Sequence, residues 1–340
     1  MDFASLLPLL DQAIQSRLAD QTASNPTLGG ISHEEAYRLF NGFYEGYPHL
    51  VLDVYARTLV IHDYADPPSH ELIQSVIQHL LHNIHAPLSW IRTIVLKTRN
   101  GISPEEKRGT IIFGDHPDKK FREHGIWYAA NLTMNRDTGF YLDTANLRKW
   151  LIENSRGKSV LNTFAYTGSL GVAAIAGGAS QVVQTDMDRK SLNIAKDSYA
   201  LNGFPIRRQD FIAQDFFHAV ARFKSSGQTF DCVIIDPPFF STTPRGRVDQ
   251  EHESERIINK VRPLVSDGGV LIAVNNAVYL SGTDYISTLE ALCADGYLSI
   301  RNLIPVPENF IGFRRVGKPV TDPAPFNHST KIAILDVRRK

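Results

Sequence analysis

Apolar residues near the amino terminus recur at helical spacing. Three or four positions separate most neighbours in this set, which comprises Phe3, Leu6, Leu7, Leu10, Ile14 and Leu18. The spacing predicts a helix that ends before the turn-rich segment 25–30. We interpret residues 1–31 as a helical extension that docks on the rest of the chain.

Short runs rich in β-branched and aromatic residues come next, with one helical pattern among them. The runs are His49–Tyr55, Leu59–Asp63, Ile91–Lys97 and Thr110–Phe113, and the helical pattern covers Pro68–His85. This mixture predicts a small α+β domain, which we place at residues 32–118. The composition becomes polar and charged over residues 114–125, so we expect the domain boundary there.

Strand and helix patterns alternate from residue 160 onward. The expected strands are Val160–Asn162, Gln181–Thr185, Ile206–Gln209, Asp231–Ile235 and Val270–Asn275. Alternation of this kind predicts parallel strands joined by crossover helices. Two further strands, Tyr297–Ile304 and Lys331–Val337, have no helix between them and are expected to pair antiparallel. Residues 119–340 are therefore predicted to form an α/β domain with a Rossmann-like, seven-stranded sheet whose last strand is antiparallel.

The composition shows no strong charge bias. The 340 residues include 36 basic and 36 acidic side chains and two cysteines, Cys232 and Cys293. So few cysteines indicate a reducing compartment and leave no thiolate set for zinc, and no run of about 18 apolar residues is present to cross a membrane. We therefore expect a cytoplasmic protein, in which any surface that binds nucleic acid is a local basic patch.

Candidate ligand residues follow the first three strands of the alternating pattern. The segment Asn162–Ser169 lacks the first glycine of the G-x-G-x-x-G pattern, so a dinucleotide is not favoured. Asp186 follows the second strand, where a carboxylate binds ribose hydroxyls, and Asp215 follows the third, where it is placed to accept from an adenine amino group. S-adenosylmethionine satisfies this combination. Taken singly, each aspartate is more often a helix cap.

A double proline follows the fourth strand, in the motif Asp236-Pro-Pro-Phe-Phe240. The prolines remove backbone donors and fix φ, so the motif presents a carboxylate, carbonyl groups and an aromatic ring. Acceptors beside a stacking face suit a planar base, and we assign Asp236, Pro237 and Phe239 to catalysis, with Phe240 as the other stacking candidate. A rigid turn that covers the sheet is the simpler alternative.

Together these motifs resemble the class I S-adenosylmethionine-dependent methyltransferases that modify large-subunit ribosomal RNA. The similarity is greatest to the branch that methylates guanine at its 7-nitrogen and to relatives that make 5-methylcytosine. It is most specific at Arg122–Gly125, Asp137–Asp143, Asn162–Ser169, Asp186–Asp188, Asp236–Ser241 and Val274–Asn276. A weaker resemblance to the family's central domain covers Ala36–Gly42, Glu45–Gly46 and Val54–Tyr55.

The resemblance implies a cofactor site and a substrate site. The residues implied for the S-adenosylmethionine site are Asp143, Asn162, Phe164, Thr167, Gly168, Asp186, Asp215 and Asp236. We expect the same site to include their neighbours Tyr141, Thr163, Tyr166, Met187 and Phe216. For the substrate we expect Phe240, Asn275, Asn276, Arg314, Arg315 and His328. The last three lie in the segment Pro305–Thr330, which we interpret as a flap that meets phosphate, although a solvated loop is an almost equal alternative.

The chain also departs from the family pattern. Relatives that make 5-methylcytosine carry a catalytic cysteine after the fifth strand, where Val274–Val278 contains none, so that activity is not expected. The guanine branch has basic residues after its paired asparagines, whereas Ala277 and Val278 stand here. We also expect that the RNA-binding module found at the front of many relatives is absent.

Methyl transfer from a sulfonium is an in-line displacement, and an acceptor with a free lone pair needs no base. We therefore expect a methyltransferase that modifies an RNA base, most simply ribosomal RNA, by direct transfer to a guanine ring nitrogen or an exocyclic amine. Neutral charge and the missing module favour the alternative, a methyltransferase for a small molecule or a protein. A cofactor-binding protein without enzymatic activity is a more distant third.

Overall fold

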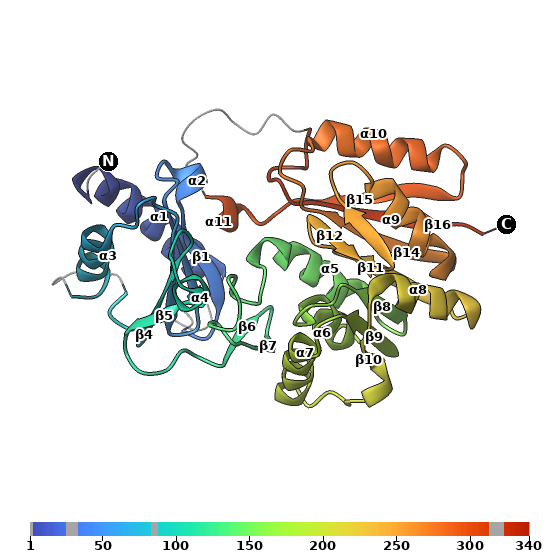
Figure 1. The fold of residues 1–340 in the computed structure, drawn as a ribbon, viewed down its shortest axis with the longest axis horizontal. Helices are drawn as coiled ribbons and strands as arrows, with labels where there is room; N and C mark the ends of the chain where they lie inside the picture. Colours follow the sequence, from blue (N-terminus) through green and yellow to red (C-terminus); the bar gives the residue numbers. More distant parts are fainter. Residues whose placement is uncertain (1–2, 25–32, 83–87, 313–322, 340) are drawn as a thin grey trace. The chain divides into compact units, whose positions relative to one another are not determined.

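The computed structural model describes residues 3–24, 33–82, 88–312 and 323–339 (Figure 1). The chain divides into two compact units. Unit 1 comprises Met1–Leu142 and Pro307–Pro319, and unit 2 comprises Asp143–Val306 and Val320–Lys340. Among the described helices, none is both long and apolar enough to span a bilayer.

Unit 1 is built on a five-stranded sheet. Its strands, in spatial order, are β1 (Ala36–Asn41), β2 (Leu50–Tyr55), β3 (Thr58–Asp63), β4 (Thr93–Thr98) and β5 (Thr110–Phe113). Neighbours are antiparallel except β3 and β4, which are parallel. A parallel pair needs a crossover connection, and this one contains α3 (His70–Ile77) and a π-helical turn (Gln78–His82).

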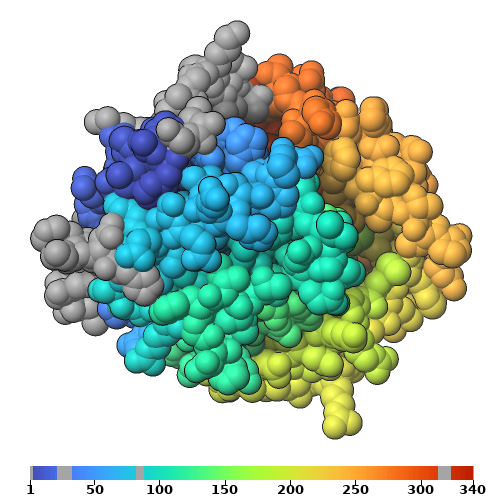
Figure 2. Space-filling view, turned by 60° about the vertical axis from the view of Figure 1, so that its left-hand side comes forward, coloured from blue at the N-terminus to red at the C-terminus, as the bar shows by residue number. Residues whose placement is uncertain are grey.

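The amino-terminal helix α1 (Phe3–Ser24) belongs to this unit and is not a separate extension. Leu6, Leu10 and Ile14 are buried in one apolar cluster with residues of the sheet and of α3. The space-filling view shows α1 in dark blue against the cyan surface of α3 (Figure 2). The docking that its apolar spacing predicted is therefore confirmed. Three short helices complete unit 1: α2 (Gly42–Glu45), α4 (Pro104–Arg108) and α11 (Glu308–Ile311).

The division between the units falls after Leu142 and not at residue 118. The segment that was expected to link the domains forms a hairpin of β6 (Lys120–Glu123) and β7 (Ile126–Ala129). Phe121 in β6 is fully buried, with its ring 5.2 Å from that of Tyr55 and 4.7 Å from that of Phe140. The ring contacts of Phe121 hold the hairpin in unit 1, although its charged neighbours in the sequence conceal it.

Unit 2 contains the predicted α/β sheet. The spatial order is β10 (Phe211–Ala213), β9 (Gln181–Asp186), β8 (Ser159–Thr163), β11 (Phe230–Ile235), β14 (Val265–Asn275), β16 (Lys331–Val337) and β15 (Leu298–Ile304). The first five strands are parallel, and β16 is antiparallel to both of its neighbours. The Rossmann-like, seven-stranded fold with an antiparallel last strand is thus confirmed.

The third strand of the α/β sheet lies later in the sequence than the apolar pattern predicts. Ile206–Gln209 was expected, whereas the strand is Phe211–Ala213, preceded by a 3-10 turn (Arg208–Asp210). Ile206 is exposed and Phe211 is buried, so burial of Phe211 sets the position of the strand.

Helices cover both faces of the unit 2 sheet, which explains its continuously apolar strands. One core contains Leu161, Val233 and Leu271 with residues of α8 (Phe216–Ser225), α9 (Ser254–Val261) and α10 (Gly282–Cys293). The opposite core contains the alternate strand residues with α5 (Ala145–Asn154) and α6 (Ser169–Ala176). The remaining elements are α7 (Arg189–Leu201), the hairpin of β12 (Phe240–Thr243) and β13 (Gly246–Asp249), and two 3-10 turns, Leu142–Thr144 and Arg262–Leu264.

Candidate functional site

The predicted motif residues of unit 2 meet at one edge of its sheet. The loops that follow β8, β9, β10, β11 and β14 all leave the sheet there, because these strands are parallel neighbours (Figure 1). We call this the carboxyl edge. In sheets of this kind ligands bind outside the carboxyl ends of the strands, so the common position is the first support for a site.

The loop after β8 has an unusual backbone. Phe164, Tyr166 and Gly168 all have positive φ, at 53°, 51° and 76°. Non-glycine residues rarely adopt this region, and they persist there only where neighbouring groups hold them. The backbone N–H of Ala165 donates to the carbonyl of Thr185 at 2.9 Å, so the loop is fixed against the end of β9.

Gln184 lies behind this loop and was not expected from the sequence. A Cβ added at Gly168 would lie 2.6 Å from Gln184 Oε1, and one added at Gly171 would lie 2.4 Å from it. The glycines therefore let the loop and the start of α6 contact this fully buried amide. Asn162 Nδ2 donates to Gln184 Oε1 at 3.3 Å, and Asn162 Oδ1 is buried without a partner among the described residues.

Asp186 connects two loops through its carboxylate. Its Oδ2 accepts from the backbone N–H of Tyr166 and its Oδ1 from that of Asp188, both at 2.8 Å. Burial raises the pKa of Asp186, an effect that these hydrogen bonds oppose. The next carboxylate, Asp188, instead caps α7 by accepting from Lys190 and Ser191.

Asp215 is both a helix cap and an available acceptor. Its Oδ1 accepts from the backbone N–H of His218 at 3.2 Å and begins α8. Its Oδ2 is buried and has no partner within the described structure, and the same holds for Gln214 Oε1. Buried acceptors without a donor are costly, so these atoms are suited to receive hydrogen bonds from a ligand.

The other predicted cofactor residues of unit 2 differ in their environment. Phe164 stacks on Phe216 with 4.4 Å between ring centroids. Thr167 is buried, whereas Met187 is exposed. The hydroxyl of Thr163 donates to the carbonyl of Ile234 at 2.8 Å, so this side chain joins β8 to β11. Tyr141 belongs to unit 1, where its hydroxyl donates to Asp137 Oδ2 at 3.1 Å.

Asp236 has the most perturbed carboxyl group of the site. Burial and the nearby carboxylate of Asp143 raise its pKa to about 7, and the fully buried guanidinium of Arg148 opposes the shift. The residue as a whole is partly exposed, whereas its carboxyl group is buried. Asp143 itself accepts a 2.7 Å hydrogen bond from the hydroxyl of Thr330. A carboxyl group that titrates near neutrality in such a place is a candidate functional group.

Aromatic rings follow Asp236 at the surface. Phe239 is 42% exposed and Phe240 is 54% exposed. Phe240 begins the β12–β13 hairpin, which packs against α8 because Gly246 lies directly on the ring of Phe217. The two rings are available to contact a ligand, whereas Pro237 is buried and its carbonyl accepts hydrogen bonds from Gln250 and Asn276.

The two asparagines after β14 have different roles. Asn275 is fully buried, with its Nδ2 donating to the carbonyl of Gln250 and its Oδ1 accepting from the N–H of Ala277. Both ends of the Asn275 amide are used within the protein, so we do not include this residue in the substrate site that we propose. Asn276 donates to the carbonyl of Pro237 at 3.3 Å, and its Oδ1 has no partner in the described part of the chain.

The expected flap is only partly described. Arg314 and Arg315 lie outside the described residues. The preceding α11 belongs to unit 1, where the carbonyl of Phe310 accepts from Asn41 at 3.0 Å. In unit 2, His328 Nδ1 accepts from the N–H of Thr330 at 3.1 Å, and Asn327 Nδ2 donates to the carbonyl of Val306 at 2.9 Å. The described residues on each side of 313–322 are thus held by hydrogen bonds to their own units.

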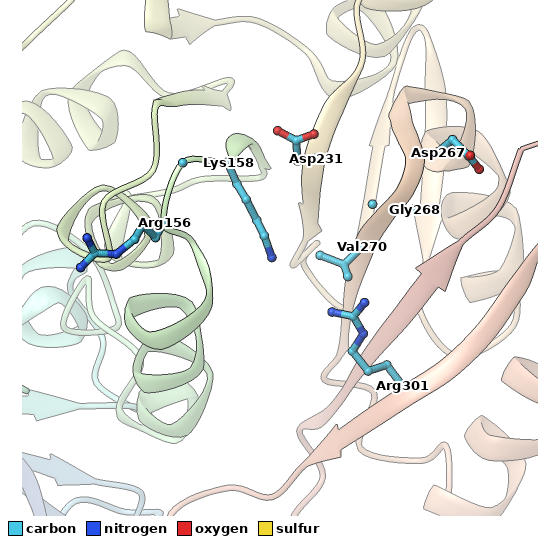
Figure 3. A pocket seen from close by; sticks show the side chains of 9 residues that line it. Arg156, Lys158, Asp231, Asp267, Gly268, Val270 and Arg301 are labelled. Atoms are coloured by element: carbon cyan, nitrogen blue, oxygen red, sulfur yellow. The ribbon is translucent and has the colours of Figure 1, made fainter.

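A separate cavity of about 340 Å³ opens near the amino ends of β8, β11 and β14 (Figure 3). Lys158 and Arg301 point toward each other across it. Arg301 pairs with Asp336, and Asp231 and Asp267 also lie at the cavity. Because acidic and basic groups offset one another there, and because the cavity lies at the opposite edge of the sheet, it does not extend the candidate site.

Comparison with protein families gives a match over most of the chain. Residues 38–310 match a family model described as S-adenosylmethionine-dependent methyltransferase. A ribosomal RNA large subunit methyltransferase K/L from Colwellia psychrerythraea is 32% identical over 254 residues, which are 71% of this chain and 34% of that protein. A ribosomal RNA large subunit methyltransferase I from Photobacterium profundum is 28% identical over 299 residues, which are 86% of this chain and 73% of that protein. The chain thus spans only about a third of the K/L relative.

Solved structures share the fold at lower identity. SMU.776, assigned as a methyltransferase and solved in complex with SAH, superimposes with a TM-score of 0.80 at 20% identity, covering 99% of this chain and 82% of that chain. An S-adenosylmethionine-dependent methyltransferase from Agrobacterium tumefaciens gives a TM-score of 0.58 at 18% identity, covering 86% of this chain and 88% of that chain. At these identities the likeness shows the fold.

Proposed function

Because the chain belongs to the S-adenosylmethionine-dependent methyltransferase family, we propose that it methylates a base of ribosomal RNA by direct transfer. The observation that carries the proposal is the position of the Asp236–Phe240 corner. It follows β11, which is the direct neighbour of β8, so its exposed rings share the carboxyl edge with the nucleoside-type loop. The names of the curated relatives support ribosomal RNA as the substrate.

We assign the binding site of S-adenosylmethionine, the methyl donor, to the residues that follow β8, β9 and β10. Asp186 would bind the ribose hydroxyls, and Asp215 Oδ2 would accept a hydrogen bond from the adenine amino group. Asn162 Oδ1 would accept a further hydrogen bond from the cofactor. The buried acceptors of Asn162 and Asp215, both without partners among the described residues, fit this assignment. When bound, S-adenosylmethionine supplies a methyl group on a positively charged sulfur. The ionised form of Asp236 would stabilise that charge.

Direct transfer is supported by the cysteines. Cys232 is buried within β11, where burial raises the pKa of its thiol to about 12. Cys293 lies at the end of α10 and not at the carboxyl edge. A covalent intermediate needs a thiolate beside the substrate, and neither cysteine supplies one. An acceptor with its own lone pair, such as a ring nitrogen, requires only alignment and exclusion of water.

Exposed apolar side chains on the neighbouring loop support a planar substrate. Val278 and Tyr279, after β14, are 69% and 82% exposed. The loop is anchored just before them, where buried Lys331 donates to the carbonyl of Ala277 at 3.0 Å. Tyr279, together with Phe239 and Phe240, adds exposed aromatic surface to the loops at the carboxyl edge, and Val278 adds apolar surface, as in proteins that bind unpaired bases. Ribosomal RNA is available in the cytoplasm, which we propose as the location.

The proposal is tested by comparing ribosomal RNA from cells with and without the gene. Mass spectrometry of the nucleosides should show one methylated base that is lost with the gene and restored by the purified protein with labelled S-adenosylmethionine. Label that enters only a protein or small-molecule fraction would instead establish the alternative that neutral net charge favours. Identical nucleoside profiles in both strains would contradict the proposal.

A further inference from the structure

We infer that Gln250 is a positioning residue that withholds the Pro237 carbonyl from the substrate and leaves Asn276 Oδ1 to receive a substrate N–H. This inference rests on the proposed function and specifies how the part of the site that binds the base recognises it. Gln250 follows the β12–β13 hairpin and is 3% exposed. No motif in the sequence singled it out.

Gln250 joins the double-proline corner to the end of β14. Its Nε2 donates to the carbonyl of Pro237 and to the carbonyl of Val274, both at 3.1 Å. Its own backbone N–H donates to the carbonyl of Phe239 at 3.0 Å. Its carbonyl accepts from Asn275 at 2.8 Å. One residue therefore fixes the corner at two points and connects it to the asparagine pair.

The orientation of both side-chain amides follows from the chemistry of their partners. The groups that face Gln250 Nε2 are carbonyl oxygens, which accept and cannot donate, so the amide nitrogen of Gln250 must face them. The same reasoning places Asn276 Nδ2 against the Pro237 carbonyl, at 3.3 Å. A carbonyl oxygen has two lone pairs, and this one receives two donors. It has no acceptor capacity left for a substrate amine.

The fixed orientation of Asn276 leaves its other end without a partner. Asn276 Oδ1 is a buried acceptor that no other described residue satisfies. Leaving such a group unpaired is unfavourable, so a donor that reaches it gains binding energy. A base that presents an N–H on its edge supplies that donor. An amine held between the Asp236 carboxyl and the Pro237 carbonyl is not the arrangement that this site offers.

Two variants separate positioning from binding. Gln250→Met keeps the length of the side chain and its burial while removing both donors, so the corner loses its fixed position. We expect kcat for methyl transfer to hypomethylated ribosomal RNA to fall about 10- to 100-fold, since small misplacements at a reacting centre have effects of this size. The Kd for S-adenosylmethionine should stay within about twofold, because Gln250 contacts none of the proposed donor-site residues. Asn276→Leu should raise KM for the RNA about tenfold or more, with the same Kd for the donor.

A matched control is available in the same sheet. Gln181 Nε2 donates to Asp210 Oδ1 at 2.7 Å at the start of β9, so Gln181→Met loses a comparable hydrogen bond at the opposite edge. Its kcat and KM should match the wild type even if its melting temperature falls. Because Gln250 and Asn276 share one acceptor, the effects of their two substitutions should not be additive in the double variant.

The outcomes distinguish this inference from the proposed function. If the wild type transfers methyl groups to RNA and folded Gln250→Met retains the kcat of Gln181→Met, Gln250 is only a structural residue and the inference is wrong. If Asn276→Leu leaves KM unchanged, the acceptor role of Asn276 is wrong. If the wild type transfers no methyl group to RNA, the proposed function fails and the inference fails with it.

Discussion

The carboxylate of Asp186 accepts a 2.8 Å hydrogen bond from the backbone N–H of Tyr166, a residue with a φ of 51°. The bond holds the loop after β8 in a backbone conformation that is unfavourable by itself. The carboxylate that we assign to the ribose thus also shapes the loop beside it. Donor binding and loop geometry therefore depend on the same side chain.

Replacing Asp186 with alanine should weaken donor binding. The variant loses a charged hydrogen-bond acceptor for the ligand and the support of the loop, so we expect a loss of about 1.5–3 kcal/mol, or roughly 10- to 100-fold in the Kd for S-adenosylmethionine. Isothermal titration calorimetry measures it. Asp188→Ala is the control, because it removes the cap of α7 and lowers stability by about 0.5–2 kcal/mol without changing that Kd by more than about twofold. Equal affinities in the two variants would contradict the assignment.

Donor binding should depend on pH through Asp236. The pKa of this carboxyl is about 7 in the free protein, so it is mostly protonated below that pH and ionised above it. A positively charged donor favours the ionised form, and its affinity should rise by up to about tenfold per pH unit as pH increases from about 5.5 to about 7, then level off. Asp236→Asn should bind weakly with no such slope. A wild-type Kd for S-adenosylmethionine that is constant between pH 5.5 and 8 would show that the carboxylate of Asp236 does not interact with the bound S-adenosylmethionine.

Gly168 should not tolerate a side chain. A Cβ at this residue would lie 2.4 Å from the Cβ of Ala195, and its φ is 76°. Gly168→Ala should therefore displace the loop and weaken donor binding at least about tenfold, in addition to a backbone cost of about 1 kcal/mol. Gly203→Ala is matched in conformation, with a φ of 70°, but has open space around it. Gly203→Ala should therefore lower stability by only the backbone cost, measured by thermal unfolding, and should leave the Kd for S-adenosylmethionine, measured by calorimetry, unchanged.

Phe240 should contribute to RNA binding and not to donor binding. Removing a stacked ring lowers affinity by about 1–3 kcal/mol per base, so Phe240→Ala should raise KM for RNA about 5- to 100-fold. Ile206→Ala is the control, since Ile206 is also an exposed apolar residue of unit 2 but precedes the outer strand β10, whereas Asp236 follows β11. Comparable KM values for the two variants would exclude the ring from the substrate site.

Unit 1 should depend on the buried pair of Arg38 and Asp53. Arg38 Nε and Nη2 donate to the two carboxylate oxygens at 2.8 and 3.0 Å, and His62 also contacts Asp53. Burial opposes ionisation, but Arg38 and His62 together hold the pKa of Asp53 below its ordinary value. The stabilisation is therefore present above about pH 4 and is lost as pH falls through the folded pKa.

Asp53→Asn should accordingly destabilise the protein by about 3–5 kcal/mol at neutral pH, because it leaves a largely buried guanidinium unpaired. Denaturant unfolding measures this loss. Glu105→Gln breaks the exposed pair with Arg108 and should change stability by less than about 1 kcal/mol. A similar decrease in the free energy of unfolding in both variants would indicate that the buried pair stabilises the protein no more than the exposed pair does.

Periodicity predicted the elements of the α/β sheet well, because each parallel strand is buried on both faces and reads as a short apolar run. Periodicity did not predict elements in which only a few side chains are buried. The third strand has only three residues, Phe211–Ala213, too few to show a period. The hairpin at Lys120–Ala129 is held by single aromatic side chains among charged neighbours, so its sequence reads as a linker.

Some residues of the candidate site can be predicted from the sequence and others cannot. Glycines and acids that follow strands, such as Gly168 and Asp186, are visible in the sequence because strand ends fix their positions. Gln184 and Gln250 are not, since their importance comes from contacts with loops distant in the sequence. Asn275 and Asn276 are adjacent in sequence, yet their hydrogen bonds differ: the amide of Asn275 is used internally at both ends, whereas Asn276 Oδ1 has no partner among the described residues.

The position of β16 has a consequence for synthesis of the protein. It is the last strand along the sequence, yet it separates β14 from β15 in the sheet. The sheet therefore cannot be completed before residues 331–337 are synthesised, because until then β14 has an unpaired edge and β15 has no strand to pair with. Unit 1 likewise includes a segment from late in the sequence, since α11 belongs to it. Unpaired strand edges in partly folded states favour aggregation.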